Sequence, residues 1–170
     1  MAPKPNLSFK LASESDIDRL ILLYNDATKY KISKSDFSWG PRPDWDEADI
    51  QKYIDAKSTH LVLESGQLVG TVTLLEMDDS KWETQNSDAL YLHRLAVSSK
   101  NRGRGLGEQI IAWCEGQVKA SKKKYLRLDC DNNNHELGEY YQQQGFKKVR
   151  VLEPQGSLNY EAALYEKEVA

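Results

Sequence analysis

The segment NRGRGLG, Asn101–Gly107, places three glycines and two arginines between an apolar run and a long amphipathic run. Glycine has no side chain to keep a ligand away from the backbone, and the first amides of a helix have no partner within that helix. A loop of this composition that leads into a helix therefore favours an anion, above all a phosphate. A plain flexible surface turn would explain the glycines equally well.

The sequence on both sides of the loop predicts a strand–helix–strand unit. The apolar run ALYLHRLAV, residues 89–97, is typical of a buried strand, and residues 106–120 place apolar side chains on a broad helical face. A short strand, YLRLD, follows at residues 125–129. This order predicts two parallel strands joined by a right-handed crossover.

The rest of the chain adds strands, helices and one long loop. Ser65-Gly66 is a two-residue hairpin signal, and an aromatic loop with prolines and glycines spans residues 30–45. The 170 residues suit one domain, 1–170, of the α+β class with a mixed sheet. Further strands are expected at residues 7–12, 60–64, 67–77, 146–152 and 159–169, and helices at 13–28, 46–54 and 134–144.

Composition and charge exclude several classes of protein. The net charge of −3 gives no general attraction to nucleic acid or to an anionic membrane. The N-terminus lacks the apolar core of a signal peptide, so we expect a cytoplasmic protein. Two cysteines without C-x-x-C spacing and three scattered histidines indicate neither a disulfide framework nor a metal site.

Two well-known phosphate loops fit the segment poorly. A Walker A loop needs Gly-Lys-Ser/Thr, which does not occur in the chain. A dinucleotide loop could begin at Gly103-x-Gly105, but residue 108 is glutamate where that pattern needs glycine. Asp129, about twenty residues further on, is the one feature that favours a nucleotide-binding oxidoreductase.

A third pattern fits better. Arg102-x-x-Gly105-x-Gly107 after LAV resembles the Q/R-x-x-G-x-G/A signature of the GCN5-related N-acetyltransferase (GNAT) superfamily, and YYQQQGF, residues 140–146, is similar to its Y-x-x-x-G-F segment. The resemblance is strongest over residues 90–149. It implies a mostly antiparallel sheet of six to seven strands with about four helices. It also implies an acetyl-CoA-dependent N-acetyltransferase, a class in which homodimers are common; a non-catalytic acetyl-CoA-binding module is the alternative.

The resemblance implies a set of cofactor-binding residues. Backbone groups at the end of the strand would pair with the pantetheine arm, the loop amides would bind the pyrophosphate, and Asn134 would contact the arm or cap its helix. Lys122–Lys124 could meet the 3′-phosphate, although a solvated helix end is the simpler interpretation. The implied residues are Leu95, Ala96, Val97, Arg102, Gly103, Arg104, Gly105, Leu106, Gly107, Asn134 and Tyr141.

Two side chains are candidates for catalysis. Tyr141 occupies the tyrosine position of the Y-x-x-x-G-F segment, whose hydroxyl acts as general acid in the family, whereas Tyr140 is expected to pack. His93 lies on a strand that resembles aralkylamine acetyltransferases, in which a histidine helps to deprotonate the amine. Strand alternation predicts that it shares a face with Tyr91, Leu95 and Val97. No glutamate, the more common base, occurs at residues 89–97, and a lone histidine could also be structural.

The amine acceptor is the least determined part of the prediction: a small amine, an amino acid, an antibiotic or an amine of a protein would each fit. In the family its pocket is shaped by the first two helices and their loop, which here could bind a cationic amine through aromatic faces and carboxylates. The acidic residues could equally favour a helix N-terminus, and the tryptophans could pack the loop. The candidates are Tyr30, Asp36, Phe37, Trp39, Asp44, Trp45, Asp46, Glu47 and Asp49, together with Tyr91 on the strand.

Overall fold

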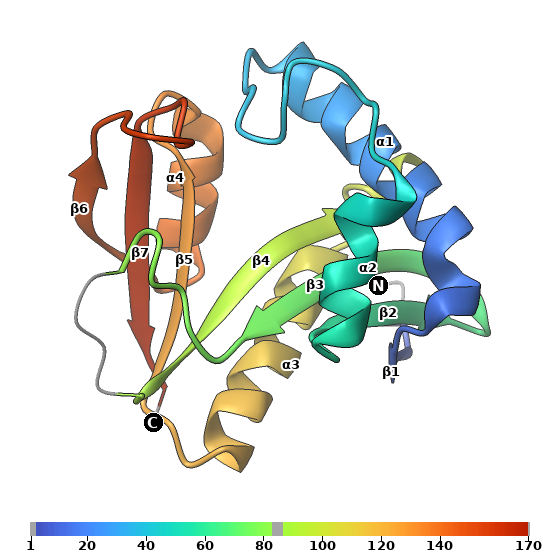
Figure 1. The fold of residues 1–170 in the computed structure, drawn as a ribbon. Helices are drawn as coiled ribbons and strands as arrows, with labels where there is room; N and C mark the ends of the chain where they lie inside the picture. The colour runs from blue at the N-terminus through green and yellow to red at the C-terminus, as the bar shows by residue number, and fades with distance from the viewer. Residues whose placement is uncertain (1–2, 83–86, 170) are drawn as a thin grey trace.

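The structure, a computed structural model, describes residues 3–82 and 87–169. Within these residues seven strands form one sheet, and helices cover both of its faces (Figure 1). The elements are β1 (Leu7–Leu11), α1 (Ile17–Ser33), α2 (Glu47–Asp55), β2 (Thr59–Glu64), β3 (Gln67–Leu75), β4 (Ala89–Val97), α3 (Leu106–Ala120), β5 (Tyr125–Asp131), α4 (His135–Gln143), β6 (Lys147–Leu152) and β7 (Ala162–Glu168), with 3-10 turns η1 (Glu14–Asp16) and η2 (Ser99–Asn101).

The strands run in the order β1-β2-β3-β4-β5-β7-β6. Only β4 and β5 are parallel, and every other neighbouring pair is antiparallel. The α3 helix joins the parallel pair, as the strand–helix–strand pattern predicts. The predicted α+β fold with a mixed, mostly antiparallel sheet and four α-helices is therefore confirmed.

The helices divide into two layers. The apolar face of α3, with Ile110 and Cys114 fully buried, packs on one face of the sheet, and Tyr141 of α4 joins the same cluster. On the opposite face, Leu20 and Tyr24 of α1 and the apolar side of α2 form a second cluster against β2. Burial of these helix stripes against the sheet supplies the main hydrophobic contribution to the fold.

Two local features test the sequence-based boundaries. Ser65 and Gly66 both adopt positive φ, 49° and 78°, so the predicted β2–β3 hairpin turn is confirmed. The first helix extends to Ser33, whereas the sequence predicted an end near Thr28. The added turn is stabilised by Asp36, whose backbone N–H donates to the carbonyl of Lys31 at 3.0 Å while its carboxylate accepts from Lys31 Nζ at 2.8 Å.

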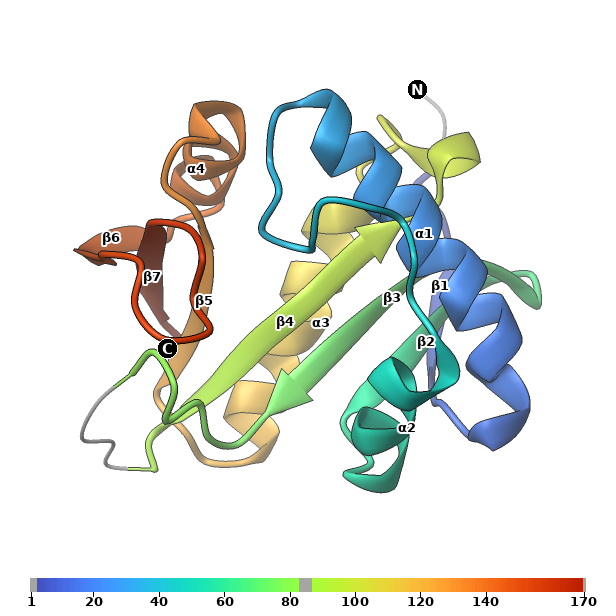
Figure 2. The same ribbon diagram turned by 45° about the horizontal axis from the view of Figure 1, so that its top comes forward.

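The parallel strands separate soon after they begin. The β4–β5 pairing spans only Ala89 to Tyr91 on β4, opposite Tyr125 to Arg127. Beyond that point β4 continues beside β3, and β5 continues beside β7. Both views show the two strands diverging from their common start (Figures 1 and 2). This divergence opens one edge of β4 in the middle of the sheet.

Candidate active site

A cavity of about 870 Å³ lies where β4 and β5 diverge, within the usual size range of small-molecule sites. Its walls come from β4, the glycine loop, the start of α3, α4, and the end of α1 with the loop that follows. Of the predicted cofactor-binding residues, the structure brings Leu95, Ala96, Val97, Arg102, Gly103, Gly105, Leu106, Gly107, Asn134 and Tyr141 to this cavity.

The glycine loop presents backbone amides at the start of α3. Gly105 is the N-cap of α3 and adopts φ 75°, a left-handed conformation that side chains disfavour. At Gly107 a Cβ atom would collide with the hydroxyl of Tyr140. Both positions therefore favour glycine, and the first amides of α3 lie on the cavity wall without partners inside the helix. This is the geometry of a phosphate-binding helix N-terminus.

The two loop arginines point in different directions. Arg102 lines the cavity, stacks 4.2 Å from the ring centroid of Tyr30, and lies 3.4 Å from Asp26. Arg104 instead forms a bidentate pair with Glu64 on β2, with both N–O distances at 2.9 Å. The cavity lining does not include it. A carboxylate on the neighbouring hairpin thus directs Arg104 away from the predicted pyrophosphate position.

A β-bulge in β4 corrects one prediction about His93. Between Thr71 and Thr73 of β3 the register shifts by one residue, and Arg94 at the bulge adopts φ 50°. His93 keeps the orientation of Tyr91, but Leu95 and Val97 turn to the face covered by α3. The expectation that all four share one face was wrong, because a bulge interrupts strand alternation. His93 and Arg94 both line the cavity, as do their neighbours on β4 from Leu92 to Val97.

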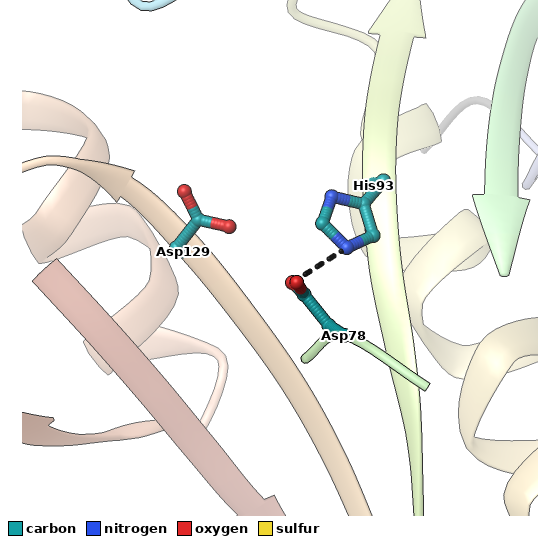
Figure 3. Close-up of side chains that lie close together, drawn as sticks. All are labelled: Asp78, His93 and Asp129. Carbon is teal, nitrogen blue, oxygen red and sulfur yellow. Dashed lines mark ion pairs between the residues drawn. The ribbon is translucent and has the colours of Figure 1, made fainter. Parts of the chain in front are cut away.

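His93 is paired with a carboxylate that sequence reasoning missed. Its Nε2 lies 3.0 Å from Oδ2 of Asp78, which follows β3 and is buried (Figure 3). Burial alone would raise the pKa of Asp78, but bonding to His93 and the imidazole charge outweigh it, so the pKa falls from 3.8 to about 2. Asp78 is therefore ionised at neutral pH and fixes the orientation of the imidazole.

A second acidic residue faces this pair across the cavity. Asp129 on β5 accepts a hydrogen bond from the hydroxyl of Tyr160 at 2.8 Å and lies 3.5 Å from Lys81 Nζ. One ligand atom each from Asp78, His93 and Asp129 lies within 4.8 Å of the others. Asp78 and His93 contact each other, and Asp129 contacts Tyr160 and Lys81, so all three have partners within the protein. The three residues come from distant segments, so no local motif indicates the cluster.

The two tyrosines of α4, Tyr140 and Tyr141, also line the cavity. Tyr141 is buried, and its ring packs against Phe146 at 5.8 Å and Tyr165 at 6.2 Å, measured between centroids. Burial raises its pKa well above the usual value, so the hydroxyl remains protonated. Tyr140, expected only to pack, also lines the cavity, beside Gly107.

Asn134 joins the two walls of the cavity. Its Oδ1 accepts from the backbone N–H of Leu137 at 3.1 Å, which confirms the helix-capping role that the sequence left open. Its Nδ2 donates to Asp36 at 2.8 Å, and Asp36 also binds Lys31. Asp36 is thus neutralised inside the protein rather than offered to a ligand.

The predicted acceptor residues divide into three groups. Tyr30, Trp39 and Trp45 line the cavity, and the two tryptophans also pack edge-to-face at 6.0 Å, so they hold the loop and shape the site at once. Tyr91 does not reach the cavity lining; its hydroxyl accepts a hydrogen bond from Arg127 at 3.0 Å beneath Trp82. The acidic residues at the start of α2, Asp46 and Asp49, form a capping box.

The lysines proposed for the 3′-phosphate and the two cysteines take no part in the candidate site. Lys123 donates to the carbonyl of Ser87 and Lys124 pairs with Glu168, both at the exposed end of α3. Both cysteines are buried; burial raises the pKa of the Cys130 thiol to about 12 and raises that of Cys114 as well. Neither thiol is set up as a nucleophile.

Taken together, the divergent parallel strands, the glycine loop at the start of α3 and the acid–base groups in one cavity define a class of acyl-group transferases. A model of the acetyltransferase (GNAT) family matches residues 20–146. The chain belongs to this family. The family predicted from the glycine loop, and with it the acetyltransferase class and acetyl-CoA as the co-substrate of that class, is confirmed.

Individual relatives agree with this assignment. The chain is 31% identical over 104 residues to a Bacillus subtilis protein named uncharacterized N-acetyltransferase YesJ, and the match spans 58% of each chain. A GNAT family acetyltransferase from Listeria monocytogenes is similar in structure, with a TM-score of 0.76, 24% identity, and coverage of 95% of this chain and 94% of that one. The Salmonella typhimurium protein yncA, solved with acetyl-CoA, has a TM-score of 0.71, 13% identity, and coverage of 97% and 95%.

One finding bears on membranes. Within residues 3–82 and 87–169, no helix combines the length and the apolar character needed to cross a bilayer.

Proposed function

We propose that this chain transfers the acetyl group of acetyl-CoA directly to a primary amine while both substrates are bound. The observation that carries the proposal is the joint position of the His93–Asp78 pair, Tyr141 and the glycine loop on one cavity. We also propose that residues 1–170 act as one catalytic domain in the cytoplasm, where acetyl-CoA is available.

The donor would be held mainly by backbone groups. Past Tyr91, β4 has no pairing with β5, so its free edge can hydrogen-bond an extended pantetheine arm as an added strand would. The amides at the start of α3 would bind the pyrophosphate, with Arg102 adding positive charge. Because Arg104 is held by Glu64, we assign it no direct part in this binding.

The amine must lose its proton before it can attack. An ordinary alkylammonium has a pKa of about 10.4, so only about one part in a thousand or less is neutral at pH 7. When the imidazole is neutral, a proton on Nε2, which lies 3.0 Å from the Asp78 carboxylate, leaves the lone pair on Nδ1 free. That nitrogen is the acceptor we assign to the proton of the amine, directly or through one water.

The leaving sulfur must gain a proton. As the amine nitrogen bonds to the carbonyl carbon and the carbon–sulfur bond breaks, the electron pair of that bond goes to sulfur. The hydroxyl of Tyr141, kept protonated by burial, donates the balancing proton. The first proton of the ammonium passes from His93 to solvent, and the proton that the nitrogen loses as the amide forms returns to the Tyr141 oxygen, directly or through water. No protein nucleophile is required, in agreement with the burial of both cysteines.

Initial rates of thiol release, with acetyl-CoA and an amine both varied, test this proposal. Direct transfer predicts intersecting double-reciprocal lines, whereas an acetyl-enzyme route predicts parallel lines. His93→Ala should lower the rate more at pH 7 than at pH 9, because the amine needs less help when it is already neutral. Binding of acetyl-CoA without turnover on any amine would reject catalysis and favour a binding module.

A further inference from the structure

The bulge residue of β4, Arg94, carries a half-buried positive charge at the cavity. The guanidinium of Arg94 lies between two rings, 4.5 Å from the centroid of Trp45 and 4.3 Å from that of Tyr53. Its Nη2 donates to the Tyr53 hydroxyl at 3.0 Å. These contacts hold the guanidinium in place, and cation–π attraction offsets part of the cost of its desolvation.

Arg94 differs from the other cations on the cavity wall. Lys31 and Lys81 pair with Asp36 and Asp129 at 2.8 and 3.5 Å. Lys34 and Arg102 pair with Glu136 and Asp26 at 3.2 and 3.4 Å. No carboxylate within residues 3–82 and 87–169 forms an ion pair with Arg94, and its Nη1 is buried without a hydrogen-bond partner among them.

A fixed, partly desolvated cation without a counter-charge favours a ligand that supplies one. A planar guanidinium is matched by a carboxylate, which it can bind through two N–H groups. Of the acidic residues that the sequence offered for a cationic acceptor, Asp36 binds Lys31, Asp44 pairs with Arg42, and Asp46 and Asp49 cap α2. The part of the cavity beside Arg94 therefore favours a negative group.

We infer that the amine acceptor is a free α-amino acid whose carboxylate binds Arg94. The inference rests on the proposed acetyl transfer and specifies its substrate class. His93 and Arg94 are consecutive residues of β4 that both line the cavity, so one short segment offers a proton acceptor and an anion site. An α-amino acid carries its amine and its carboxylate on one carbon, so one small molecule presents both groups to this wall. Trp39 and Trp45 give the wall an aromatic surface for an apolar side chain.

Matched acceptors test the inference. Thiol release would be measured with phenylalanine, with phenylalaninamide, and with phenethylamine, which lacks the carboxylate altogether. The wild type should favour phenylalanine in kcat/KM by at least about 30-fold over both, the low end expected when one partner of a desolvated charge pair is removed. Arg94→Gln should abolish this preference, and Arg94→Lys should restore part of it.

Arg42 supplies a control on the neighbouring loop. Its side chain is 78% exposed, pairs only with Asp44 among the described residues, and is absent from the cavity lining. Arg42→Gln therefore removes one positive charge without touching the site, and it should keep the preference for phenylalanine. Circular dichroism and the melting temperature of each variant would show whether Arg94→Gln remains folded.

Binding to the CoA-loaded protein gives a readout that does not depend on turnover. Titration with N-acetylphenylalanine and with its amide should show tighter binding of the acid, and Arg94→Gln should remove the difference. Equal binding of acid and amide by the wild type, or equal turnover of phenylalanine and phenethylamine, would overturn the inference. Tighter binding of the acid without thiol release from any amine would uphold the anion site and reject the proposed catalysis.

Discussion

Replacement of Asp78 by asparagine tests the buried pair that orients His93. The lowered pKa of Asp78, from 3.8 to about 2, means that the folded protein stabilises its ionised form. A shift of nearly two units corresponds to about 2 kcal/mol of folding free energy at neutral pH. Asp78→Asn keeps the size of the side chain and an acceptor oxygen, so this value is the upper limit of the expected loss.

The pH dependence of this stabilisation follows from the sign of the pKa shift of Asp78. The pKa of Asp78 is lower in the folded than in the unfolded protein, so its stabilisation is complete above about pH 4 and disappears as the pH falls through about 2. Urea unfolding of the wild type and Asp78→Asn at pH 7, 5 and 3 measures this. The difference in unfolding free energy should be largest at pH 7 and 5 and should begin to shrink by pH 3.

Glu76 provides the matched control, because it is an exposed carboxylate in the same segment. Glu76→Gln should change the unfolding free energy by less than about 0.5 kcal/mol, as surface substitutions usually do. The reasoning would be refuted if Asp78→Asn cost nothing at pH 7, or if its cost stayed constant from pH 7 to pH 3. The same variant should also lower kcat, because the imidazole then lacks a fixed orientation.

Further predictions concern the loop and the acid. Gly105→Ala places a side chain at φ 75°, so it should destabilise the protein by about 1 kcal/mol in urea unfolding and weaken acetyl-CoA binding in titration calorimetry. Arg104→Ala should leave the Kd for acetyl-CoA within about threefold of wild type, because Arg104 pairs with Glu64; this is far less than the loss expected for a charged contact to the ligand. Tyr141→Phe should lower kcat about 100-fold with little change in the KM for acetyl-CoA, as for removal of a general acid; a wild-type kcat would exclude that role.

Local sequence signals predicted the framework of this site well. The glycine loop, the Ser65-Gly66 turn and the strand–helix–strand unit each depend on residues close together in the chain, and the structure contains all three. Asn134 at the start of α4 is another case, because capping depends on the three residues that follow it. Signals of this kind also carried the resemblance that identified the family.

The chemistry of the site depends on features that no local pattern encodes. The bulge at Arg94 results from the register between β3 and β4, and it reverses the faces of all later residues in β4. Asp78 meets His93, and Asp129 meets Lys81 and Tyr160, only because the sheet brings distant segments together. The orientation of Arg104 likewise depends on Glu64, forty positions earlier.

Amide hydrogen exchange with and without acetyl-CoA tests the central claim most directly, that the donor lies between β4 and β5 with its pyrophosphate on the loop. Binding should slow exchange at residues 95–97, 102–103 and 105–108, which line the cavity, and leave the exposed β2–β3 turn at Ser65 and Gly66 unchanged. Protection at the turn with none in the loop would contradict the claim.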